Sequence, residues 1–229
     1  TIKGSRSKTS FPKIISSTHP DENVWYANNN PKFTWELPKD ATAVRVLYDQ
    51  LPDTQPTLVY EPPIAERELG GVADGIWYFH IQFKNSRGWG KAVHYRAQID
   101  TAPPDSFVIQ FPDGRETFES EPRVGFSTTD ALSGIDRYEI KINEGYFLNV
   151  KELKQDKSFY ILPAQPIGER QISVKAFDKA GNATEVNDLL IVKPRYGNYL
   201  KIAVAIAVIL TLFAFIVWNQ KRRKIKHKI

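Results

Sequence analysis

The sequence predicts an all-β protein: two tandem β-sandwiches followed by a single transmembrane α-helix. Two observations predict this order. A pattern of short strands occurs twice, at an offset of 91 to 93 residues, and a long apolar run lies close to the C-terminus. The expected divisions are a linker from an upstream region at 1–11, sandwiches at 12–101 and 102–193, the helix at 199–218 and a basic tail at 219–229.

The internal repeat is carried by two pairs of matching segments. Pro31–Trp35 matches Pro122–Phe126, and Trp77–Gly88 matches Arg170–Gly181. A repeat unit of this length corresponds to a whole domain rather than to one turn of a solenoid.

Both copies of the second segment alternate apolar and polar residues, as half-buried strands do. In the first copy the expected inward side chains are Trp77, Phe79, Ile81 and Phe83, and the outward ones are Tyr78, His80, Gln82 and Lys84. In the second copy Ile172, Val174 and Ala176 are expected to point inward. We expect His80 and His94 to form an exposed cross-strand pair.

Further strands are expected at 44–48, 93–99, 107–111, 138–142, 159–162 and 185–192. These segments are short and no amphipathic helix separates them, which favours a sandwich of about seven strands in each copy. The segment Asp100–Asp105 joins the copies, and its two prolines predict a short, semi-rigid linker.

The apolar run from Leu200 to Trp218 is interrupted only by Lys201 and Thr211. Its length as a helix is about 28 Å, close to the thickness of a bilayer core. Tyr196, Tyr199 and Trp218 flank it as an aromatic belt would. A buried core helix is the alternative, but the run has no polar face.

Positive charge is concentrated after this run and includes Lys221, Arg222 and Arg223. The dense cluster predicts a single-pass protein of the cell membrane, with a cytoplasmic C-terminus and residues 1–195 outside. The tail is expected to touch anionic lipid, with partner or nucleic-acid binding by the tail as the alternative. Residues 1–195 carry 24 basic against 26 acidic groups, so no nucleic-acid partner is expected. The first thirty residues have no apolar signal segment, so an export signal is expected upstream of Thr1.

The first copy resembles the fibronectin type III-like domains of bacterial surface proteins. The segments that carry this resemblance are Ser16–Asp21, Trp25–Tyr26, Asn28–Trp35, Asp74–His80 and Gly88–Gly90. The second copy resembles bacterial Ig-like modules through Asp100–Pro104, Ser133–Ile135, Tyr138–Ile140 and Val174–Asn182. Such modules serve as spacers or binding surfaces, so the resemblance implies a fold more than a function. Where these folds often place a corner tyrosine, the copies hold Trp77 and Arg170, neither of which has a hydroxyl.

Little in the sequence points to catalysis. The absence of cysteine excludes disulfides, thiol nucleophiles and zinc ribbons, and no hydrolase or phosphate-binding motif is present. We expect no enzymatic activity and no cofactor. Calcium is one candidate ligand, because loops at one end of the second copy carry Asp130, Asp136, Asp178 and Asn182. Separate capping of turns by each acid is the alternative.

Four aromatic residues at loops or edges of the first copy could contact a ligand, or could simply pack at the core and rim: Trp25, Tyr26, Trp89 and Tyr95. The function predicted first is that of a membrane-anchored stalk or adhesion module with a surface protein or polysaccharide as partner. The alternatives are a carbohydrate- or ligand-binding receptor that uses these aromatics, and the stalk of an enzyme whose catalytic domain lies upstream.

Overall fold

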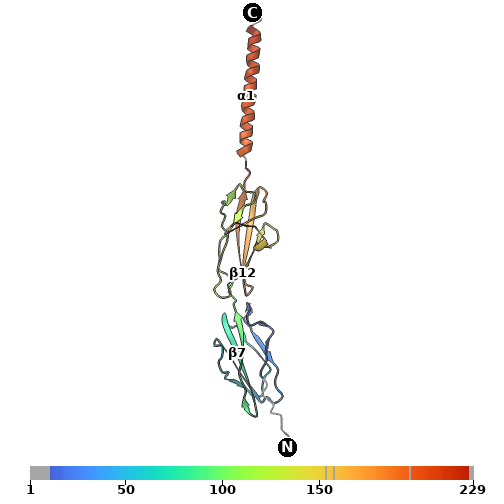
Figure 1. Ribbon diagram of the computed structural model, residues 1–229, viewed down its shortest axis with the longest axis vertical. Coiled ribbons are helices and arrows are strands. Elements are labelled where there is room, and N and C mark those ends of the chain that lie inside the picture. The colour runs from blue at the N-terminus through green and yellow to red at the C-terminus, as the bar shows by residue number, and fades with distance from the viewer. Residues whose placement is uncertain (1–10, 153, 157, 196, 227–229) are drawn as a thin grey trace.

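The computed structural model describes residues 11–152, 154–156, 158–195 and 197–226. Figure 1 shows two β-sandwiches end to end, with one long helix continuing beyond the second sandwich. This order of elements confirms the predicted all-β architecture with one C-terminal helix.

The first sandwich is built from two sheets. Its strands are β1 (Ile14–Ser16), β2 (Trp25–Tyr26), β3 (Lys32–Trp35), β4 (Ala43–Asp49), β5 (Leu58–Tyr60), β6 (Glu66–Glu68), β7 (Gly75–Asn85), β8 (Gly88–Trp89) and β9 (Val93–Ile99). One sheet has the order β1-β3-β6, and the other has the order β2-β9-β7-β4-β5 with β8 paired to β7. All pairs are antiparallel except β2 with β9.

The second sandwich repeats this plan. Its elements are β10 (Glu116–Thr117), β11 (Arg123–Val124), β12 (Ile135–Ile142), β13 (Leu148–Asn149), the 3-10 helix η1 (Val150–Glu152), β14 (Lys154–Asp156), β15 (Phe159–Ile161), β16 (Gly168–Asp178) and β17 (Ala183–Val192). The sheets have the orders β10-β17-β16-β12-β13 and β11-β15-β14. The first strand of the larger sheet again pairs in parallel with the last. Both sandwiches therefore have the immunoglobulin or fibronectin III-like strand order.

Each sandwich has its own apolar core between its two sheets. In the first, the rings of Phe33 and Phe79 stack with centroids 4.4 Å apart, and Trp35 is buried as its place on β3 predicts. In the second, the core contains Ile172 and Val174, which were expected to point inward. The two cores have no residue in common.

Two expectations about strands and faces were wrong. Residues 107–111 form no strand, because only Gln110 makes an isolated bridge, to Gly125. His80 lies on the outer face of its sheet, as predicted, but it is fully buried rather than exposed. Its Nδ1 lies 2.6 Å from Nδ1 of His94, and its Nε2 lies 3.0 Å from a carboxylate oxygen of Asp49, at the end of β4.

The helix α1 (Gly197–Lys226) contains a stretch, Lys201–Asn219, that is long and apolar enough to cross a membrane, with a mean hydropathy of 2.5. None of this stretch is buried against the rest of the protein, which excludes the alternative of a buried core helix. The helix begins before the predicted span and includes Lys221, Arg222 and Arg223 from the predicted tail. Tyr199 and Trp218 are exposed, and Tyr196 lies outside the described residues.

Candidate functional site

The linker between the sandwiches is hydrogen-bonded to both of them. On the side of the first sandwich, Asp100 donates its backbone N–H to the carbonyl of Tyr26, and Thr101 donates to the Asp74 carboxylate at 2.9–3.0 Å. On the side of the second sandwich, the Asn182 amide donates to the carbonyls of Asp100 and Ala102 at 2.8 and 3.1 Å. The linker is therefore fixed along its length rather than free.

Three carboxylates meet at this linker. One oxygen from each of Asp100, Asp130 and Asp178 lies within 4.8 Å of the others. Asp100 and Asp178 are almost completely buried, at 0% and 1% exposed. In the part of the chain that the structure describes, none of the three has a Lys, Arg or His within ion-pair distance.

Backbone amides surround these carboxylates. Asp130 accepts hydrogen bonds from the N–H groups of Leu132 and Gly134 at 3.1 and 2.8 Å. Asp178 accepts from Gly181 and Asn182 at 2.7 and 2.8 Å, and Asp100 accepts from Ser133 at 3.0 Å. The contacts of Asp130 and Asp178 are the turn capping expected as the alternative to calcium, whereas the contact of Asp100 crosses from one sandwich to the other. They stabilise each charge separately, but the three like charges still repel one another.

The chemistry of this cluster suits a hard divalent cation, which takes carboxylate and carbonyl oxygens. Of the predicted calcium ligands, Asp130 and Asp178 lie together as expected. Asp136 does not join them, because its carboxylate pairs with Arg137 at 3.0 Å. Asn182 reaches the cluster through its amide nitrogen, which donates to Asp178 at 2.8 Å.

Asp100 is the member that sequence reasoning missed. It follows β9, the last strand of the first sandwich, whereas Asp130 and Asp178 lie in loops of the second sandwich. The sequence could have indicated Asp100. The last strand of the first sandwich ends beside the linker, and the linker leads into the loops of the second sandwich. Calcium binding stays a prediction, now with Asp100 in the place given to Asp136.

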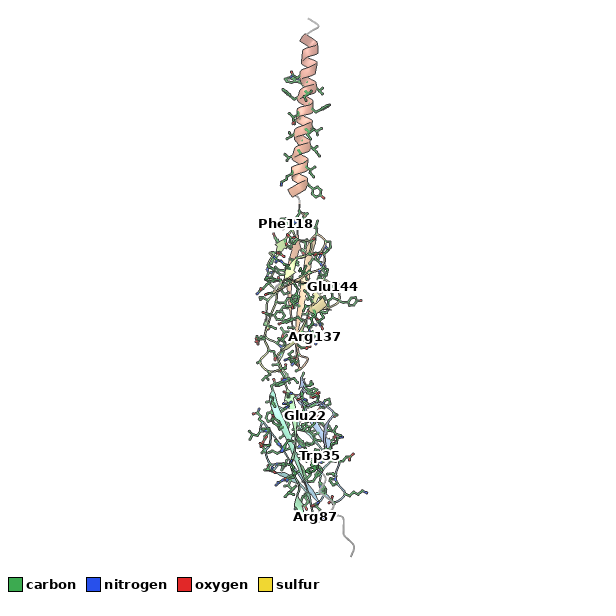
Figure 2. The ribbon with its side chains drawn as sticks, viewed as in Figure 1. Glu22, Trp35, Arg87, Phe118, Arg137 and Glu144 are labelled. Carbon is green, nitrogen blue, oxygen red and sulfur yellow. The ribbon has the colours of Figure 1, made fainter. Side chains whose placement is uncertain are left out.

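The four aromatic candidates do not form one surface. Trp25 pairs with Gln98 at the linker end of the first sandwich. Trp89 pairs with Lys84 at the opposite end of β7, about 26 Å away at the usual rise of a strand. In Figure 2, Arg87 marks that far end of the sandwich.

Two of these aromatic side chains have structural roles. Tyr95 lies in the first core, contrary to its expected place at an edge, and its hydroxyl donates to the His19 carbonyl at 2.6 Å. The Tyr26 hydroxyl accepts a hydrogen bond from the backbone N–H of Asp21 at 2.9 Å.

Half-buried Trp89 lies against the guanidinium group of Arg45, whose central carbon is 4.5 Å from the centroid of the Trp89 ring.

No protein-family model matches the sequence, and no curated protein matches it either. Among solved structures, the chain is similar to the fibronectin(III)-like modules of Clostridium thermocellum CbhA, with 13% identity, a TM-score of 0.44, and coverage of 80% of this chain and 95% of that one. It is also similar to a tetra-tandem repeat from the extending region of a large adhesion protein, with 16% identity, a TM-score of 0.31, and coverage of 79% and 48%. A third similar structure is dimeric latent PorU from Porphyromonas gingivalis, with 11% identity, a TM-score of 0.35, and coverage of 80% and 24%. The fold follows from the strand order and the two cores, independently of these similarities.

Proposed function

We propose that this chain is a membrane-anchored stalk or adhesion module that holds its N-terminal end away from a cell membrane. The observation that carries the proposal is the arrangement in Figure 1: two sandwiches and an apolar helix follow one another along one axis, and the linker is hydrogen-bonded to both sandwiches. With β7 and β16 of 11 residues each, two sandwiches end to end measure about 70 Å.

The proposed topology is single-pass, with the sandwiches outside and the basic end of α1 in the cytoplasm. The positive residues near Lys221 support this orientation and would contact anionic lipid. Protease added to intact cells that express the chain should remove the sandwiches and spare a C-terminal tag. If the protease removes the tag and leaves the sandwiches intact, the chain has the opposite orientation in the membrane.

The height of the stalk tests its function directly. A donor dye at the N-terminal end of the full chain, reconstituted in vesicles, should transfer little energy to acceptor dyes in the bilayer surface. A donor at Ser106, next to the linker, should transfer more. Equal transfer from both positions would mean that the first sandwich folds back onto the membrane, and the chain would not be a stalk.

A surface protein or polysaccharide is the proposed partner of the first sandwich. Because Trp25 and Trp89 lie at opposite ends of it, each would act alone. Trp25→Ala and Trp89→Ala, tested separately for binding to cell-surface polysaccharide, would show which end is used.

A further inference from the structure

The end of the second sandwich nearest to α1 exposes two large apolar side chains, Phe118 and Ile167. They are 55% and 65% exposed, and both border a cavity of about 280 Å³ that is also lined by Val192, Pro194 and Arg195. Figure 2 shows Phe118 at the end of the sandwich from which the helix continues. Neither side chain belongs to the apolar core of the sandwich, so both are available for contact with an apolar phase.

The chain itself places this end close to any bilayer that α1 crosses. The last strand, β17, ends at Val192, and the stretch of α1 that could span a membrane begins at Lys201. Residues 193–196 reach about 14 Å even when fully extended, and the first turn of α1 adds about 6 Å. The headgroup layer on each side of the hydrocarbon core takes up roughly 5–8 Å of that distance. The end of the sandwich is therefore tethered within about 15 Å of the headgroup surface.

The charges around the cavity do not make this end a cationic surface. Lys193 is paired with Glu116, and Arg195 is paired with Glu119. Exposed Glu121 lines a neighbouring pocket together with Glu119 and Ser120 and adds negative charge there. Attraction to anionic headgroups would therefore be weak, whereas transfer of exposed Phe and Ile side chains out of water is favourable wherever they reach an apolar phase.

We propose that Phe118 and Ile167 insert into the headgroup–acyl boundary of the bilayer that α1 crosses, so that the second sandwich stands on the membrane by its end. The proposal rests on the proposed function, in which α1 spans a membrane. It adds that the stalk has a second, apolar contact with the lipid. This contact fixes the angle of the stalk to the membrane.

The test uses the full chain reconstituted in phosphatidylcholine vesicles. Because the sequence has no cysteine, Ser120→Cys gives a single site next to the cavity for an environment-sensitive dye. Ser106→Cys, at the linker end of the same sandwich, is the matched control. The dye at 120 should emit at shorter wavelength and be quenched by spin-labelled lipid, while the dye at 106 should remain in a water-like environment.

A second pair of proteins identifies the residues responsible. Phe118→Ser with Ile167→Ser, made in the labelled Ser120→Cys chain, should abolish the shift and the quenching. The melting of the second sandwich should change little, because both side chains are exposed. The shift should also persist in high salt and be no larger in vesicles with anionic lipid.

Other outcomes would overturn the inference. Water-like emission from position 120 in a chain that floats with the vesicles would refute the lipid contact and leave the membrane anchor intact. A shift that disappears when the protein is diluted at constant lipid would identify a second copy as the occupant. Failure of the chain to float with the vesicles would refute the proposed function as well.

Discussion

The indole N–H of Trp77 donates a hydrogen bond to the carbonyl oxygen of Ala73, four residues upstream, at 2.8 Å. Arg170, the matching residue of the second sandwich, donates from Nη2 to the carbonyl of Pro166 at the same distance of 2.8 Å. Both pairs hold the turn that leads into the long strand, β7 or β16. The bond that a tyrosine hydroxyl often makes at this corner is thus made by two different N–H donors.

Trp77→Phe tests the value of this bond in the first sandwich. Phenylalanine keeps an aromatic ring against Tyr48, whose ring stacks on Trp77 with centroids 5.2 Å apart, but it has no N–H. The loss should lower the free energy of unfolding of the first sandwich by about 0.5–1.5 kcal/mol. Trp77→Ala should cost more, because it also removes the stacking.

Urea unfolding followed by tryptophan fluorescence measures this change selectively. Of the five tryptophans, four lie in the first sandwich, one in α1 and none in the second sandwich. Trp35→Ala, which removes a side chain only 5% exposed, provides the reference for a core residue and should cost about 3–5 kcal/mol. If Trp77→Phe unfolds at the same urea concentration as the parent, the corner bond contributes nothing.

Strand alternation predicted which side chains face the core, and it succeeded where packing alone decides the outcome. Phe79, Ile81 and Phe83 are buried as expected, whereas Trp77, the fourth residue expected to point inward, is only half-buried and lies outside the core. The same alternation in β9 could have placed Tyr95 in the core beside Ala97, and the interpretation of Tyr95 as an edge residue was wrong. Alternation assigns a residue to one face of a sheet, but it does not say what covers that face.

The outer face of the first sandwich shows this limit. His80 was correctly placed outward, yet it is buried through contacts with His94 and with Asp49, which come from neighbouring strands. The prediction of which carboxylates form the cluster was partly wrong for a related reason. The expected loop arrangement places Asp136 near Asp178. In the structure, however, the Asp136 carboxylate forms an ion pair with the neighbouring Arg137. Contacts that depend on side-chain direction or on a neighbouring domain are not encoded in local periodicity.

Asn182→Ala should loosen the linker without unfolding either sandwich. The substitution removes the two hydrogen bonds from the Asn182 amide to the carbonyls of Asp100 and Ala102, while each core stays intact. Spin labels placed one on each sandwich should show a broader distribution of distances in the variant. Asn187→Ala, an exposed position on β17, the strand that begins directly after Asn182, is the control and should leave the distribution unchanged. An unchanged distribution in Asn182→Ala would show that the remaining contacts fix the linker.

Calcium is expected to stabilise the tandem through Asp100, Asp130 and Asp178. A ligand at a hundredfold excess over its dissociation constant adds about 2.7 kcal/mol to the free energy of unfolding. The melting temperature should therefore rise by several degrees with calcium and fall back on chelation. Asp100→Asn should weaken this response, whereas Asp136→Asn should leave it intact. If calcium does not change the melting of the parent protein, the three carboxylates serve only to cap turns.

The first sandwich should lose more stability in mild acid than the second. All histidines before α1, His19, His80 and His94, belong to the first sandwich. Burial lowers the pKa of His94 below its usual value near 6.5, and the neighbouring His80 lowers it further. Burial also lowers the pKa of His19. For such groups the unfolded chain binds protons more readily than the folded one, so their contribution is complete above about pH 6.5 and is lost as the pH falls below it.

The geometry of the pair explains why protonation of His94 is unfavourable. The Nε2 of His80 faces a carboxylate oxygen of Asp49 and donates to it, so a neutral His80 offers an acceptor at Nδ1. Only one proton fits between the two Nδ1 atoms, which are 2.6 Å apart. If both rings become cationic, two N–H groups face each other and the contact must break. Asp53, Lys91 and Tyr78 are further charged or titratable groups near the pair.

The variant His94→Gln distinguishes the contribution of the His80–His94 pair to acid sensitivity from that of His19. The glutamine amide can donate to His80 but does not titrate, so the variant should show a smaller fall in stability between pH 7.5 and 5 than the parent protein. Tryptophan fluorescence follows the first sandwich in this experiment, and circular dichroism follows the second, whose melting should change much less over the same range. Equal acid sensitivity in His94→Gln and the parent would assign the whole effect to other groups, His19 first among them.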